Sequence, residues 1–297
     1  MNRIYFFFLA ASAIQITSGC VTSSENSSLK VAATTSNSIV ITQIDHIIIS
    51  VSDPKTLHNF LTETFKLPVA WPVREYGQFA SGGVFLGNVN LEILRIGTPQ
   101  LSGTSTNAYF QGIAFRPTSL ATAVPELDNR KISHGAPKPF NMSFSNGGSS
   151  LLWTVVYLNG FSGSNDMIFL CEYAFNIESQ NATNLSALKS NGGGALGLQG
   201  ASEIVVQSQE SLAAAKHWNN LFSPVSAYGN QWSFGKGPNF HLISGKNDQI
   251  QALVLRVKSL TDARKFLLNN NLLGSKTEGS ITIDPKKVNG LMISLVE

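Results

Sequence analysis

The sequence has few charged residues and few cysteines, and it lacks several widespread catalytic motifs. Charged residues make up 13% of the 297 residues and hydrophobic ones 43%, so most of the chain is expected to fold around a core. The net charge of +3 comes without a dense Lys/Arg cluster, which argues against nucleic acid as a partner. No GxSxG, P-loop or dinucleotide fingerprint is present. The two cysteines form no CxxC pair and no zinc-type spacing.

Residues 1–20 predict an export signal. Arg3 supplies a positive start, and the apolar run from Ile4 to Ile16 is too short to span a bilayer, which needs about 20 apolar residues. Residues 17–20 (TSGC) resemble a bacterial lipobox, so Cys20 is expected to carry a lipid that anchors the protein in the bacterial cell envelope, on the periplasmic or outer-surface side. An ordinary secretory signal is the alternative. If Cys20 is acylated, Cys171 has no disulfide partner and is expected to be a buried free thiol. A disulfide between Cys20 and Cys171 is the competing possibility.

Residues 21–38 are rich in Ser and Thr and predict a flexible tether, with the folded part beginning near Ile39. A strand is predicted at 44–51, followed by a helix that begins with Ser52-Asp53-Pro54 and carries apolar residues at helical spacing. Three short strands follow, near 69–71, 83–86 and 89–96. This unit therefore has the order β-α-β-β-β.

The same order recurs along the chain. A second unit is predicted from a strand at 112–116, a helix at 119–130 and strands at 151–158 and 167–173. A polar, Gly-rich linker is expected at 176–197. Strands at 203–208, 239–243, 253–257 and 291–296, with helices at 210–222 and 261–270, form the second half. Matched segments such as RPTSL (116–120) and RVKSL (256–260) occur in the same order in both halves, which predicts a duplication.

Four segments carry a resemblance to a known superfamily: IDHIIISVSDP (44–54), NLEIL (90–94), GIAFRPTSL (112–120) and MIFLCEY (167–173). They resemble the vicinal oxygen chelate superfamily of glyoxalase I and the extradiol dioxygenases, and most of all its glyoxalase-like domains. The resemblance implies an α+β fold of four βαβββ modules that form two cupped mixed β-sheets with helices packed outside. Two glyoxalase-like domains are thus expected, at 39–175 and 198–297.

The resemblance also implies a metal site, because family ligands come from the first and fourth strands of each module. His46, Glu92 and Glu172 stand at such positions, with Gly112 in the fourth place. One imidazole and two carboxylates suit a divalent ion such as Mn, Fe(II), Ni or Zn, with open positions for a substrate that has adjacent oxygens. Glu172 is expected to double as general base. The missing second histidine argues against extradiol cleavage.

The second half has weaker candidates. Glu203 and His241 match His46 and Glu92 with the residue types exchanged, and Ala252 and the terminal Glu297 take the remaining places. A second metal site is one interpretation. The other is that this half is structural or binds an apolar ligand.

Three functions compete on this reading. The first is a divalent-metal-dependent lyase or isomerase acting on a small oxygenated molecule. The second is a metal-free binding protein of the same fold, with Trp153, Tyr157 and Trp232 as ligand-stacking residues, although simple core packing also explains these aromatics. The third is a lipoprotein that scaffolds other envelope proteins. The enzyme interpretation requires His46, Glu92 and Glu172 to converge.

Overall fold

The computed structural model describes residues 38–97, 107–143, 148–161 and 166–297. The predicted signal segment with Cys20, and the tether up to residue 37, lie outside the described residues. Within the described ranges, no helix is long and apolar enough to cross a membrane.

The first module has the predicted order. Strand β1 (Ile41–Ser50) is followed by α1 (Pro54–Asn59), which continues as a π-helical turn, Phe60–Thr64. Strands β2 (Val69–Glu75), β3 (Phe79–Phe85) and β4 (Asn90–Ile96) complete it. The helix begins where predicted because the Asp53 side chain accepts a hydrogen bond from the backbone N–H of Thr56 at 3.2 Å, with Pro54 in the first turn.

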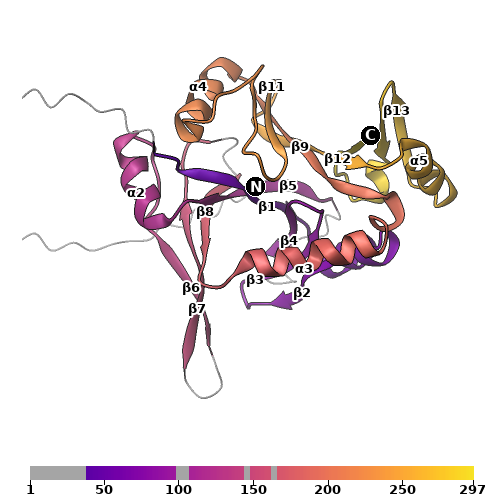
Figure 1. Ribbon diagram of the computed structural model, residues 1–297, viewed down its shortest axis with the longest axis horizontal. Coiled ribbons are helices and arrows are strands. Elements are labelled where there is room, and N and C mark those ends of the chain that lie inside the picture. Colours follow the sequence, from indigo (N-terminus) through magenta and orange to yellow (C-terminus); the bar gives the residue numbers. More distant parts are fainter. Residues whose placement is uncertain (1–37, 98–106, 144–147, 162–165) are drawn as a thin grey trace, which may run out of the picture. The chain divides into compact units, whose positions relative to one another are not determined.

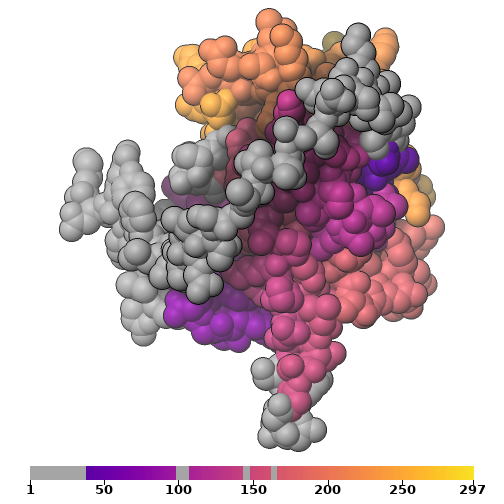
Figure 2. Space-filling view, turned by 90° about the vertical axis from the view of Figure 1, so that its left-hand side faces the viewer, coloured from indigo at the N-terminus to yellow at the C-terminus, as the bar shows by residue number. Residues whose placement is uncertain are grey.

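The second module repeats this order and joins the first in one sheet. It consists of β5 (Tyr109–Pro117), α2 (Leu120–Asn129), β6 (Lys138–Ser143), β7 (Ser149–Tyr157) and β8 (Met167–Tyr173). The eight strands are arranged β2-β3-β4-β1-β5-β8-β7-β6, so β1 and β5 pair at the centre. The β6–β7 ribbon extends away from the rest of the sheet (Figures 1 and 2).

The segment 176–197, expected to be a linker, is mostly helical. Helix α3 (Ile177–Ser190) is followed by a short 3₁₀ turn, Gly194–Leu196. The Asn176 side chain caps the helix by accepting from the N–H of Ser179 at 3.1 Å. Buried Leu188 and contacts with β2 and β3 fix α3 on the first module (Figure 1). Polar residues are spread around this helix, so the sequence shows no clear apolar stripe that would have indicated a helix within the expected linker.

The second half forms a seven-stranded sheet with the order β10-β11-β9-β12-β15-β14-β13. Its third module is β9 (Leu198–Ser208), α4 (Ser211–Phe222), β10 (Gln231–Trp232) and β11 (Asn239–Ser244). Its fourth is β12 (Gln249–Val257), α5 (Leu260–Asn269), β13 (Leu273–Thr277), β14 (Ser280–Ile283), a 3₁₀ turn (Pro285–Lys287) and β15 (Ile293–Val296). The third module departs from the predicted pattern, because two strands rather than three follow its helix within residues 198–244, all of which are described.

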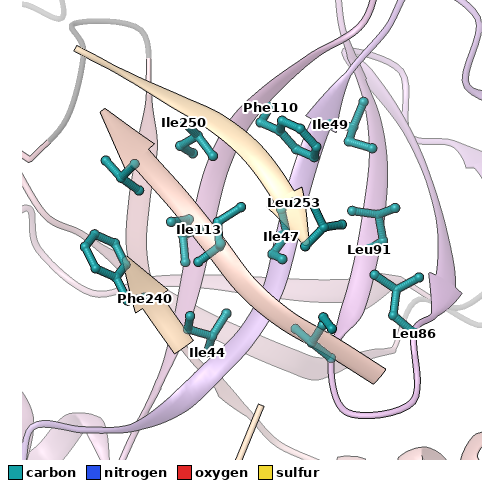
Figure 3. Close-up of a cluster of buried hydrophobic side chains, with 14 of the residues drawn as sticks. Ile44, Ile47, Ile49, Leu86, Leu91, Phe110, Ile113, Phe240, Ile250 and Leu253 are labelled. Carbon is teal, nitrogen blue, oxygen red and sulfur yellow. The ribbon is translucent and has the colours of Figure 1, made fainter. Parts of the chain in front are cut away.

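The two halves share one hydrophobic core. Ile47, Leu91 and Ile113 of the first sheet lie in the same buried cluster as Phe240 and Leu253 of the second (Figure 3). The described residues accordingly all belong to one compact unit. The two predicted glyoxalase-like regions are therefore joined through their sheets and helices by a continuous apolar interior.

The first sheet has a second face, on the side opposite to this shared core. We call it the open face. It carries a smaller apolar cluster whose buried members are Ile48, Leu94, Ala114, Val155, Phe169 and Cys171. Because side chains alternate along a strand, every second residue of β1, β4, β5, β7 and β8 is directed to this face.

Candidate functional site

His46 and Glu92 meet on the open face, as the sequence predicted. His46 is on β1 and Glu92 on the neighbouring parallel strand β4, where it stands beside Ile48. The Nε2 atom of His46 lies 3.3 Å from Oε2 of Glu92. The side chain of His46 is 8% exposed and that of Glu92 is 17% exposed, so Glu92 is the more accessible of the two.

Asp45 holds the other side of the His46 ring. Its Oδ2 atom lies 2.8 Å from His46 Nδ1. The pairing of β1 with β5 shifts register between Ile44 and His46, which marks an irregularity at Asp45. Such a bulge redirects a side chain that would otherwise point to the opposite face. Two consecutive residues of one strand can thereby act together.

The Asp45 carboxylate is completely buried and is held by two further groups. Arg116 of β5 donates from Nε to Asp45 Oδ1 at 2.9 Å, with Nη2 at the same oxygen, and also pairs with Glu178. The Tyr173 hydroxyl donates to Asp45 Oδ2 at 2.6 Å. Burial alone would raise the pKa of Asp45, but the hydrogen bond to His46 and the charges of His46 and Arg116 lower it below its usual value.

His46 is held as a cation by its two carboxylate neighbours. Burial by itself would lower the pKa of the imidazole, but the hydrogen bonds and charges of Asp45 and Glu92 outweigh burial and raise this pKa to about 9. Both ring nitrogens then carry protons at neutral pH and donate to carboxylates. The site is thus a chain of alternating charges, from Glu92 to His46, Asp45 and Arg116.

Two residues of the first module continue the chain beyond Glu92. The Ser81 hydroxyl donates to Glu92 Oε1 at 2.6 Å, and Trp71 Nε1 donates to the Ser81 hydroxyl at 3.0 Å. Gly83 lies directly opposite Glu92 in the β3–β4 pairing. A Cβ atom at Gly83 would come within 2.6 Å of the Trp71 ring, so the missing side chain allows the indole to cross the open face beside Glu92.

Strand register identifies the matching positions of the second module. Ile47 of β1 lies opposite Ile113 of β5, and the two modules are related about this pair. His46 stands beside Asn90 and Ile48 beside Glu92, while Gly112 stands beside Met167 and Ala114 beside Phe169. The places of His46 and Glu92 are therefore taken by Gly112, as predicted, and by Phe169.

Neither of these positions offers a metal ligand. A Cβ atom at Gly112 would meet the Met167 backbone at 2.4 Å and Ile48 Cδ1 at 3.0 Å, so the place of that side chain is filled. The Phe169 ring packs edge-on against the His46 ring, with centroids 5.7 Å apart. The His46–Glu92 pair is therefore bordered on the Phe169 side by an apolar ring.

Glu172, the predicted third ligand and general base, does not join His46 and Glu92. It is three residues beyond Phe169 and lies between Cys171 and Tyr173, both of which belong to the open face. Strand alternation therefore directs Glu172 to the helix side. There its Oε1 atom accepts a hydrogen bond from the N–H of Leu120 at 3.2 Å, at the first turn of α2. In this structure its carboxylate caps a helix, on the side of the sheet opposite His46 and Glu92.

Glu297 has the same role in the second half. Its Oε2 atom accepts from the N–H of Leu260 at 3.0 Å, at the start of α5. Both helices also begin with a serine cap, Ser119 and Ser259. The duplication thus includes these two glutamates, which satisfy free N–H groups and place negative charge at the positive end of each helix.

The donor atoms present do not fit the three-ligand divalent centre implied by the family resemblance. The open face supplies His46 Nε2 and Glu92, already hydrogen-bonded to one another, while Asp45 is committed to His46, Arg116 and Tyr173. In the described part of the chain, no group of three or more His, Cys, Asp and Glu side chains is placed to hold a metal ion. A zinc or iron site of the usual kind needs at least three protein ligands.

The second half keeps a corresponding pair. Glu203 of β9 and His241 of β11 lie together, with 3.1 Å between His241 Nδ1 and Glu203 Oε2. Their side chains are 28% and 33% exposed, so the pair is much more open to water than His46 and Glu92. Strand register places Ala252 and Ser294 at the other two positions, which again offers no further carboxylate or imidazole.

The three aromatic candidates fall into two groups. Trp153 and Tyr157 of β7 pack against the open-face cluster and are partly exposed, as ligand-wall residues should be. Trp232 is completely buried in the shared core. Cys171 is a buried free thiol on the open face, and burial raises its pKa well above the ordinary value, so it stays protonated.

Asp45, Ser81, Trp71, Arg116 and Tyr173 were missed as site residues by sequence reasoning. Only Asp45 carried a local signal, since it directly precedes His46 within an otherwise apolar strand. The others are brought in from separate strands, and their contribution depends on register.

The chain has the vicinal oxygen chelate fold, as the repeated βαβββ pattern predicted. No protein-family profile matches the sequence. No curated protein matches it either.

Solved structures with the same fold are distant in sequence. Homoprotocatechuate 2,3-dioxygenase from Brevibacterium fuscum, as a variant, aligns with a TM-score of 0.58 at 12% identity over 90% of this chain and 74% of its own. A mutant of 4-hydroxymandelate synthase from Streptomyces coelicolor gives 0.58 at 12% identity, over 87% and 93%. A hypothetical protein from Staphylococcus aureus gives 0.55 at 12% identity, over 85% and 98%.

Proposed function

We propose that the protein binds and transforms a small oxygenated molecule on the open face of the first sheet, as a glyoxalase-like lyase or isomerase. The observation that carries the proposal is the His46–Glu92 pair, 3.3 Å apart, at the matched positions of β1 and β4. Glu92 takes the role of proton acceptor that the sequence had suggested for Glu172, because Glu92 is partly exposed on the open face whereas Glu172 caps α2.

The surroundings of Glu92 suit a bound organic molecule. Trp71 lies beside it across Gly83, and Tyr157 packs on Phe169 with ring centroids 5.4 Å apart. Aromatic walls around a few polar groups are typical of small-molecule sites. The Tyr157 hydroxyl stays a hydrogen-bond donor, because burial and the nearby Glu92 charge raise its pKa. Two of the proteins with the same fold are named as a dioxygenase and a synthase, which supports an enzymatic function.

A metal-free binding protein is the second candidate function. It is favoured by Phe169 and the filled space at Gly112, which close two of the four ligand positions of the family. A divalent ion would find only His46 and Glu92 as side-chain ligands, and its remaining ligands would have to come from water or substrate. The two candidates agree on the site and differ on whether chemistry occurs there.

One experiment tests the site and separates the candidates. Residues 21–297 are screened by ligand-observed NMR against small hydroxy and carbonyl compounds, and each bound compound is followed for conversion with and without added Mn, Fe(II), Ni or Zn. Binding should be lost in Glu92→Gln and in His46→Ala and kept in Glu203→Gln, the matched change in the second half. Conversion supports the enzyme, and binding without conversion supports the binding protein. Ligands that bind Glu92→Gln as well as wild type would exclude this face.

Metal analysis adds an independent measurement. If an ion belongs to the site, the purified wild-type protein should hold it and His46→Ala should not. Equal metal content in the two proteins would remove the metal from the proposal and leave the ligand site in place.

The lipid anchor on Cys20 is a separate proposal, supported by the TSGC pattern of residues 17–20. It would place the site in the bacterial cell envelope. Incorporation of a labelled fatty acid should occur in the full chain and be absent in Cys20→Ala. Equal labelling of both proteins would refute it.

A further inference from the structure

The two oxygens of Asp45 are used differently. Oδ1 faces the Arg116 guanidinium, and Oδ2 accepts from His46 Nδ1 at 2.8 Å and from the Tyr173 hydroxyl at 2.6 Å. The Asp45 side chain is 0% exposed, so no water competes for these oxygens. An ionised carboxylate can only accept hydrogen bonds. The proton between Asp45 and His46 must therefore be on Nδ1.

We propose that Asp45, fixed by Arg116, is the positioning residue of the site: it holds the His46 ring with its Nδ1 proton directed at Asp45 and its Nε2 directed at Glu92. The inference rests on the proposed function, because it explains how Asp45, through His46, keeps Glu92 in place for a ligand. It assigns the orientation of His46 to one residue that does not itself reach the ligand. A histidine whose Nδ1 proton is held by a fixed carboxylate keeps one ring orientation, so that its Nε2 stays directed at Glu92.

The second half of the chain provides a natural counterpart. Strand register matches Glu203 with His46, so Ser202 takes the place of Asp45 and Arg256 that of Arg116. Arg256 Nη2 reaches Ser202 Oγ at 3.4 Å, which repeats the contact between Arg116 and Asp45 without its charge. In the first half, where the next residue of the strand is His46, this position carries the carboxylate of Asp45. In the second half, where the next residue is Glu203, it carries the neutral Ser202.

The substitution Asp45→Asn tests the proposal, because it should remove the proton from Nδ1 of His46. Arg116 requires an acceptor, so the asparagine oxygen should stay on the Oδ1 side and its NH₂ group should face His46. Nδ1 must then accept rather than donate, and the imidazole loses its Nδ1 proton. In protein labelled with ¹⁵N-histidine at pH 7, the His46 Nδ1 resonance should move from the protonated to the unprotonated region. The resonance is assigned from its absence in His46→Gln.

Two matched variants and the wild type complete the test. Tyr173→Phe removes a hydrogen bond from the same Oδ2 but leaves an acceptor, and Ser202→Ala changes the counterpart position, so both should keep Nδ1 protonated. The proposal is overturned if Nδ1 is unprotonated in the wild type, if it stays protonated in Asp45→Asn, or if either control loses the proton. The wild-type spectrum decides even where Asp45→Asn fails to fold. No ligand is needed, so the result is independent of whether the proposed function holds.

Discussion

At the scale of single residues, the site depends on which face of a strand each side chain occupies. His46 and Glu92 reach the same face and lie 3.3 Å apart, whereas Glu172 is offset by three residues from the position of Phe169 and points to the other face. Because side chains alternate with a period of two, an odd offset moves a residue to the opposite side of the sheet. A short motif match does not reveal an error of this kind.

The charge on His46 predicts a pH dependence of stability. The pKa of this imidazole is about 9 in the folded protein against an ordinary value of 6.5, so the folded state holds the proton more tightly. The resulting stabilisation is complete below pH 6.5 and is lost as pH rises through about 9. It is on the order of 3 kcal/mol, since one pKa unit corresponds to about 1.4 kcal/mol.

Chemical denaturation at pH 6 and pH 9.5 measures this dependence. The wild type should lose unfolding free energy between the two values, and His46→Gln should show a clearly smaller loss. The same loss in both proteins would show that His46 is not the titrating group.

At the scale of elements, each half uses the end of its last strand to start a helix. Glu172, near the end of β8, accepts a hydrogen bond from the N–H of Leu120 in α2. Glu297, directly after β15, accepts one from the N–H of Leu260 in α5. A carboxylate there satisfies a helix N–H and stabilises the helix dipole. Glu172, which was predicted as a metal ligand, and Glu297 therefore both cap the helix of their module.

Substitution of these glutamates should lower stability without affecting ligand binding. Glu172→Ala and Glu297→Ala should each lower the free energy of unfolding by about 1 kcal/mol, the usual effect of losing a helix cap. Thermal denaturation measures the change, with Glu210→Ala as a control, because the side chain of Glu210 makes no capping hydrogen bond to α4. If Glu172→Ala abolished binding or conversion while remaining folded, the original assignment of Glu172 to the site would be correct.

At the scale of the whole molecule, the two halves share an interior rather than a flexible link. Ile47 and Ile113 of the first sheet and Leu253 of the second belong to one buried cluster (Figure 3). Arg130 also joins the halves, donating from Nη1 to the carbonyls of Leu221 and Ser223 at the end of α4 at 3.1 and 3.0 Å. A shared core of this kind makes the two sheets depend on one another.

We expect the described part of the chain to unfold in one transition. Leu253→Ala should lower the free energy of unfolding by about 2–5 kcal/mol and shift that whole transition, because Leu253 is fully buried. Leu268→Ala should have little effect, since Leu268 is 58% exposed. Differential scanning calorimetry that resolved two transitions, with only one moved by Leu253→Ala, would contradict a shared core.

The pairing of His46 with Glu92 was implied by the family resemblance, whereas the sequence by itself determined the repeated modules and the α+β fold. These follow from local patterns: apolar runs with period two or 3.6, capping residues such as Asp53, and segments repeated in the same order. Helix α3 was not predicted from the sequence, because its apolar residues form no clear stripe. The third module has two strands after its helix instead of the expected three. Turn-forming residues with positive φ, including Gly229, Asn230 and Gly235, interrupt the chain there.

The tertiary structure decided which residues complete the site. Register placed Phe169 rather than Glu172 beside the histidine, a bulge placed Asp45 on its far side, and Arg116 and Tyr173 arrived from neighbouring strands. It also decided that the two halves share one core. The physical reason is that spacing along a chain fixes the period of each element, whereas the pairing of strands far apart in sequence fixes which faces and which side chains meet.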